Sequence, residues 1–229
     1  MRARLLFLAA LALALIAPPA LAHAIGGTDA QFVHNTTGWD PFPFIYLGAK
    51  HMVTGYDHLL FLTGVIFFLY RLKDVLIYVT LFSIGHSTTL LLGVIFDFGL
   101  SSRLVDMVIG LSVAYKAFEN LGGFRTLHLQ FDTRIAVAAF GLVHGLGLAT
   151  KLQKLGLNPD GMIPNLISFN VGVEIGQLIA LSIILVLMTL WRTTRSFGRL
   201  AIGANALLFL AGVVLAGEQL AGYLLVGDA

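Results

Sequence analysis

Six long hydrophobic stretches dominate this sequence and constrain its fold more than any other feature. Helices that cross a bilayer need roughly 20 predominantly apolar residues. Only 11% of the residues are charged, whereas a soluble domain usually carries about 25%. We therefore expect an all-α polytopic membrane helix bundle with about six transmembrane helices. The six stretches are Phe44–Tyr70, Val75–Phe96, Leu104–Phe118, Ile135–Thr150, Ile163–Trp191 and Leu200–Val226.

Residues 1–22 have the layout of a cleavable signal peptide. Two arginines precede a short apolar stretch, and a Pro-Pro pair ends it before small residues. Cleavage after Ala22 or after Ala24 is compatible with this pattern, and an uncleaved first span is the alternative. Cleavage after Ala22 makes His23 the mature N-terminus, where the amine and the imidazole together form a possible extra metal ligand.

The distribution of basic residues predicts how the spans are oriented. A cleaved signal leaves residues 23–43 as an N-terminal segment on the outer face, followed by the six-span domain, residues 44–229. The first, third and fifth loops then lie in the cytoplasm and, with the adjoining span ends, hold eight Lys and Arg against four on the outer side. This bias agrees with the positive-inside rule. An even number of spans places both termini outside.

The most unusual polar group lies at the entrance of the first hydrophobic stretch. His51, Asp57 and His58 belong there to one short motif. Ionisable groups are penalised within a membrane, so their presence indicates a function. His51 and His58 are seven residues apart, which puts them on one helix face but two turns from each other. We interpret them as successive stations on a path rather than one cage, although Gly55 between them allows a bend.

Two more histidines lie within later hydrophobic stretches. His86 lies near the middle of the second stretch and is followed by Ser87, and His144 precedes Gly145 in the fourth. Taken singly, each is explained by helix packing, because small and hydroxyl-bearing residues are common at tight contacts between membrane helices.

The fifth hydrophobic stretch contains a polar stripe. Asn170, Glu174 and Gln177 are spaced i, i+4 and i+7, so they share one helix face. In the predicted topology Glu174 and the histidines reach overlapping depths that are open towards the outside. Imidazole mixed with carboxylate suits divalent transition-metal ions better than calcium or magnesium. The expected metal ligands are His51, Asp57, His58, His86, His144 and Glu174, supported by Asn170, Gln177, Ser87 and Gly145.

Other chemistries find less support in the sequence. It contains no cysteine and no phosphate-binding loop, Gly-x-Ser-x-Gly elbow or His-Glu-x-x-His motif, so we expect neither an enzyme nor a nucleic-acid-binding protein. One competing interpretation is a haem-binding or redox membrane protein with His86 and His144 as axial ligands. Another is a membrane accessory that holds a metal or a partner without transporting anything.

The motifs also resemble a known family. His51-x5-Asp57-His58 resembles the signature in the first span of the HupE/UreJ permeases, and the segments around His86, His144 and Glu174 are similar to the second HupE/UreJ-like subgroup. The resemblance implies a bacterial inner-membrane protein that handles nickel, or else cobalt, for hydrogenase or urease maturation proteins. Copper, zinc and iron also fit the ligand types.

The fourth stretch departs from the better-studied members of that family. Those members resemble Phe-His-Gly-x-Ala-His-Gly-x-Glu, whereas the stretch from Phe140 here lacks one histidine and the glutamate. We hypothesise that Glu174 supplies the missing carboxylate. The expected path loads the ion on the outside at His51 and releases it to the cytoplasm past Tyr115, Glu119 and Asn120.

Overall fold

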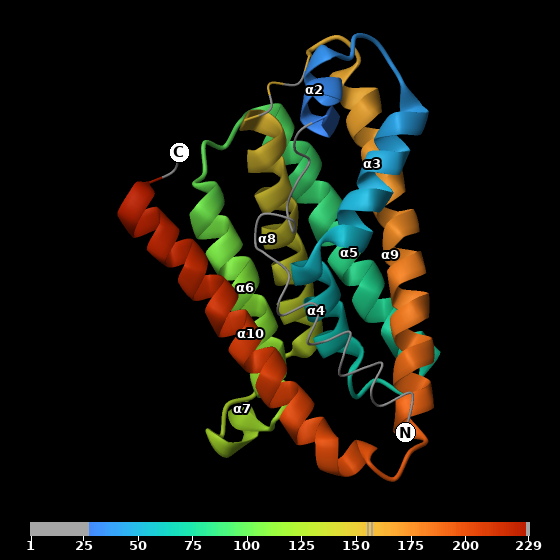
Figure 1. Cartoon of the computed structure of the whole chain (residues 1–229), viewed down its shortest axis with the longest axis vertical. Helices are drawn as coiled ribbons and strands as arrows, with labels where there is room; N and C mark the ends of the chain where they lie inside the picture. Colours follow the sequence, from blue (N-terminus) through green and yellow to red (C-terminus); the bar gives the residue numbers. More distant parts are fainter. Residues whose placement is uncertain (1–27, 155, 157, 228–229) are drawn as a thin grey trace.

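The computed structural model describes residues 28–154, 156 and 158–227 (Figure 1). All regular secondary structure in this part of the chain is helical, as expected. The predicted signal peptide and His23 lie outside the described residues, so they stay predictions. The helices are α2 (Thr28–Asn35), α3 (Pro41–Thr54), α4 (Tyr56–Ile66), α5 (Leu72–Phe96), α6 (Ser102–Asn120), α7 (Gly123–Thr126), α8 (Thr133–Lys154), α9 (Met162–Arg192) and α10 (Phe197–Val226).

Four of these helices, α5, α8, α9 and α10, are long and apolar enough to cross a membrane. This protein is therefore a helical membrane protein. The first expected span is divided at Gly55 into α3 and the shorter apolar helix α4. The third expected span is α6, a helix of 19 residues that contains two basic and two acidic side chains. Six crossings thus remain a prediction, since the two other candidate spans are broken or charged.

The long helices pack mainly as three pairs, α3 with α9, α5 with α8, and α6 with α10 (Figure 1). Glycines allow the backbones of each pair to approach closely. A Cβ atom at Gly176 of α9 would lie 2.6 Å from the carbonyl oxygen of Ala49 in α3. One at Gly85 of α5 would lie 2.7 Å from the carbonyl oxygen of Ala138 in α8. Small residues at such contacts are how membrane helices gain packing energy.

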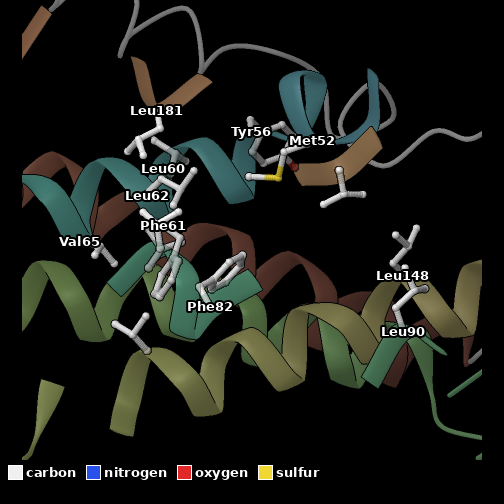
Figure 2. Packing of buried hydrophobic residues seen from close by; sticks show 14 of the residues in the cluster. Met52, Tyr56, Leu60, Phe61, Leu62, Val65, Phe82, Leu90, Leu148 and Leu181 are labelled. Atoms are coloured by element: carbon white, nitrogen blue, oxygen red, sulfur yellow. The ribbon is translucent and has the colours of Figure 1, made fainter. Parts of the chain in front are cut away.

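The core lies around α4, which packs mainly against α6 and also contacts α3, α5, α9 and α10. Phe61 of α4 and Phe82 of α5 are 1% exposed and pack against each other, with ring centroids 5.3 Å apart. Figure 2 shows these two rings beside Leu60, Leu62 and Val65 of α4. In contrast, many large apolar side chains of α9 and α10 are exposed, as expected for helices whose outer surface contacts lipid.

Candidate metal centre

The break between α3 and α4 creates the site. Gly55 has an extended backbone conformation (φ −70°, ψ 97°), and its N–H still donates to the carbonyl oxygen of His51. A Cβ atom at Gly55 would lie 2.8 Å from Nδ1 of His58 and 3.1 Å from Oδ1 of Asp57. Only glycine leaves room for these side chains to fold back over the break.

The bend turns the seven-residue spacing into a direct ring contact. The imidazole centroids of His51 and His58 are 5.1 Å apart. The interpretation of these histidines as successive stations is therefore wrong, because it assumed a continuous helix. They contribute to one cluster.

Three histidines from three other helices surround His58. Its ring centroid lies 5.8 Å from that of His86 in α5 and 5.0 Å from that of His144 in α8, in addition to His51. None of the four residues is more than 7% exposed. Within the described residues, two groups place one donor atom per residue within 4.8 Å of one another: His51, His58 and His86, and Asp57, His58 and His144.

Hydrogen bonds orient two of the imidazoles. Oδ1 of Asp57 lies 3.0 Å from Nδ1 of His58, so an ionised Asp57 accepts from Nδ1–H and leaves the lone pair on Nε2. The Ser112 hydroxyl donates to the carbonyl oxygen of Ile109, and its oxygen therefore accepts from Nε2–H of His144 at 3.1 Å. Metal-binding histidines usually have their second nitrogen fixed in this way.

Several imidazole nitrogens of the cluster are buried without a hydrogen bond. They are Nε2 of His51, Nε2 of His58 and both ring nitrogens of His86. A buried polar atom that lacks a partner costs about 1–3 kcal/mol. Three histidines with this cost, gathered in one place, indicate that a ligand satisfies them.

Aromatic side chains surround the cluster and exclude water from it. Phe82 stacks on His86, with centroids 6.1 Å apart, and meets the ring of His144 edge-on at 5.1 Å. Phe61 lies 5.3 Å from the ring of His144. Gly145 brings α8 against α5, because a Cβ atom there would collide with the carbonyl oxygen of His86. A dry surrounding strengthens any electrostatic interaction with a bound cation.

The structure does not bring Glu174 into the cluster, contrary to our expectation. Asn170 and Gln177 are buried, but Glu174 is exposed. Viewed along the helix axis, the buried side of α9 extends from Gly172 to Asn170. Glu174 follows Asn170 by four residues, so its side chain lies about 40° outside this buried side. The polar stripe is thus divided at the edge of the α9 interface.

The predicted supporting residues have packing roles. The amide nitrogen of Gln177 donates to Oγ of Ser83 in α5 at 2.8 Å, which ties α9 to α5. The amide nitrogen of Asn170 donates to the carbonyl oxygen of Leu166 within α9. Ser87 is half-buried beside His86.

Sequence reasoning did not identify Ser112 as part of this site. It lies in a stretch of α6 that is otherwise apolar, and its partner His144 is 32 residues away in the chain. A single serine in an apolar stretch is a weak signal in one sequence. Asp106 of α6 pairs with Lys151 of α8 at 2.9 Å.

Comparison with known proteins identifies the family of this chain. A family model described as HupE / UreJ protein matches residues 28–226. The chain belongs to the HupE/UreJ family. In this HupE/UreJ protein the match includes all four helices that contribute histidines to the cluster. Neither curated proteins nor solved structures provide a match.

Proposed function

We propose that this HupE/UreJ protein is a permease for a divalent transition-metal ion, with nickel or cobalt favoured. The observation that carries this proposal is the convergence of four buried histidines from α3, α4, α5 and α8 with one carboxylate. A membrane protein needs such a set to replace the hydration shell of a divalent ion.

The ligand assignment follows from the hydrogen bonds. His51, His58 and His86 offer lone pairs of neutral imidazole, a ligand type suited to nickel, copper, zinc and iron. Asp57 orients His58 and adds a negative charge that offsets the charge of the ion. His144 completes the set on the side of Asp57. Glu174 has no part in this assignment.

The proposed topology has six crossings, with α3 and α4 forming the first and α6 the third. The signal peptide is removed, both termini lie in the periplasm, and the protein resides in the bacterial inner membrane. His86 and His144 each lie ten residues before the end of their helix, which places the cluster about 15 Å below the outer ends. A membrane potential contributes about 2.3 kcal/mol per charge per 100 mV to inward movement of a cation.

Metal analysis of the full-length protein, purified in mild detergent without chelator, tests the proposal. We expect about one equivalent of a transition metal, lost in His58→Ala but retained in a control variant, His34→Ala, which alters an exposed histidine of α2. Uptake of nickel and cobalt into proteoliposomes should show the same dependence. If the purified protein neither contains nor binds nickel, cobalt, copper or zinc, the proposal is wrong.

The same measurements separate the alternatives. A protein that binds the metal but takes up none is an accessory rather than a permease. The haem interpretation conflicts with the ring packing, because His58 and Phe82 both contact His86 and His144, and a porphyrin between the two histidines has to displace them. A Soret band in the visible spectrum of the purified protein would restore that interpretation.

A further inference from the structure

A lysine–carboxylate pair, in which the lysine is buried and the carboxylate is partly exposed, lies near the end of α6. Nζ of Lys116 lies 2.7 Å from Oε2 of Glu119, and the Lys116 side chain is 9% exposed. The other oxygen of Glu119 accepts a hydrogen bond from Oγ1 of Thr133. The cost of desolvating the buried ammonium offsets part of the attraction between the two charges. Stability alone is therefore a weak reason for this pair.

The pair is connected to the histidine cluster through residues of α6 and through aromatic rings. Lys116 follows Ser112 by one turn on the same face of α6, and Ser112 contacts His144. Phe61 packs against His144 on one side and against Phe140, at 5.8 Å, on the other. Phe140 in turn lies 5.2 Å from the ring of Tyr115, the residue before Lys116.

Glu119 also borders a cavity of about 470 Å³ at the α6–α8 connection. Arg125 and His128, from the segment that contains α7, line the same cavity. The carboxylate thus has Lys116 on one side and an open cavity on the other. In the proposed topology this cavity faces the cytoplasm, and the charge of Arg125 favours the departure of a cation over its retention.

The opposite end of α6 has a similar arrangement. Asp106 pairs with Lys151 and lies close to Gly147, where a Cβ atom would be 3.4 Å from Oδ1 of Asp106. Gly147 is one turn from His144 on α8. Lysine–carboxylate pairs therefore lie on both sides of the histidine cluster along α6.

We propose that Glu119 is a second, carboxylate-based cation site on the inner side of the cluster, and that the Lys116 ammonium occupies it as a built-in substitute cation. This inference rests on the proposed function, in which a divalent ion leaves the cluster towards the cytoplasm. The ammonium neutralises Glu119 between passages, and an arriving divalent ion competes for the same oxygens. The carboxylate is thereby closed to other ions while no cargo is present.

Manganese binding to the purified full-length protein, measured by electron paramagnetic resonance, tests this inference. Carboxylate oxygens suit Mn²⁺, whereas imidazole clusters prefer later transition metals. Lys116→Met keeps most of the apolar stem and removes the charge, so we expect more bound Mn²⁺ than in the wild type at the same free Mn²⁺ concentration, since the carboxylate of Glu119 is freed. Lys116→Met/Glu119→Gln should lose this additional Mn²⁺ again. Lys73→Met, which removes an exposed lysine at the start of α5, should bind as the wild type does.

Nickel binding at the histidine cluster is measured on the same samples and reports whether each variant is folded. If Lys116→Met retains nickel but gains no manganese, this inference is wrong and the proposed function stands. If Lys116→Met gains manganese and no sample binds nickel, the inner site holds and the proposed function fails. If Lys116→Met does not fold, Lys116→Gln, which keeps a hydrogen-bond donor for Glu119, takes its place with the same expected gain.

Discussion

Replacing Gly55 by alanine tests whether the break between α3 and α4 builds the metal site. The backbone angles of Gly55 are open to alanine, so the change causes no conformational strain. The new methyl group instead meets Nδ1 of His58 at 2.8 Å, the carbonyl oxygen of His51 at 3.0 Å and Oδ1 of Asp57 at 3.1 Å. His58 cannot move aside cheaply, because it is bonded to Asp57 and packed against three other imidazoles.

Overpacking of this kind costs about 1–3 kcal/mol. If His58 moves out of the metal-binding arrangement to avoid the methyl group, metal binding becomes weaker by about this free energy. Since 1.4 kcal/mol is a factor of ten in affinity, nickel binding should weaken about 5- to 150-fold. Alanine is also more favourable than glycine within a continuous helix, by roughly 0.5–1 kcal/mol. This preference opposes the break between α3 and α4 and therefore weakens nickel binding further.

Titration calorimetry with nickel on the purified variant measures this effect. Gly203→Ala on α10 is the matched control, because a Cβ atom there meets nothing within 4 Å. The control should bind nickel as the wild type does. Wild-type nickel affinity in Gly55→Ala, with an unchanged thermal unfolding temperature, would refute the idea that this glycine is required for the site.

Three further predictions follow from individual contacts. Ser112→Ala removes the oxygen that fixes the histidine of α8, so nickel affinity should fall about tenfold, whereas Ser182→Ala, an exposed hydroxyl bonded within α9, should leave the titration unchanged. Gly85→Ala puts a methyl group against the backbone of α8 and should lower the free energy of unfolding by about 1–3 kcal/mol; an unaltered thermal unfolding curve in detergent would contradict the close packing. Glu174→Gln should leave the metal content of the purified protein unchanged, since the carboxylate is exposed on α9, and loss of the metal would return Glu174 to the ligand set.

The sequence predicts which residues belong to the site better than it predicts how they are arranged. Asp57, His58, His86 and His144 were expected because ionisable groups are costly within apolar spans, and this cost is visible without a structure. The cluster that they form with His51, in which two ligand groups share His58, was not expected. It depends on a bend at Gly55, and a glycine within a helical pattern is compatible with a continuous helix as well as with a break.

The position of Glu174 shows the limit of periodicity. A spacing of i, i+4 and i+7 correctly indicates that three side chains share a face to within about 60°. It does not indicate where that face stops being covered by a neighbouring helix. The edge of the buried side of α9 falls between Asn170 and Glu174, so Asn170 and Gln177 are buried and Glu174 is exposed.

The sequence by itself determined that this chain is a helical membrane protein, because 11% charged residues cannot solvate the surface of a soluble domain of this size. It also indicated the ligand types, since the chain has no cysteine and places imidazole and carboxylate groups within apolar stretches. The tertiary structure decided which of these groups meet. Glycines at the helix contacts determine how closely the helices pair. The break at Gly55 directs α4 into the core, and aromatic rings pack around the histidine cluster. These are relations between helices distant in the chain, and no local pattern of residues records them.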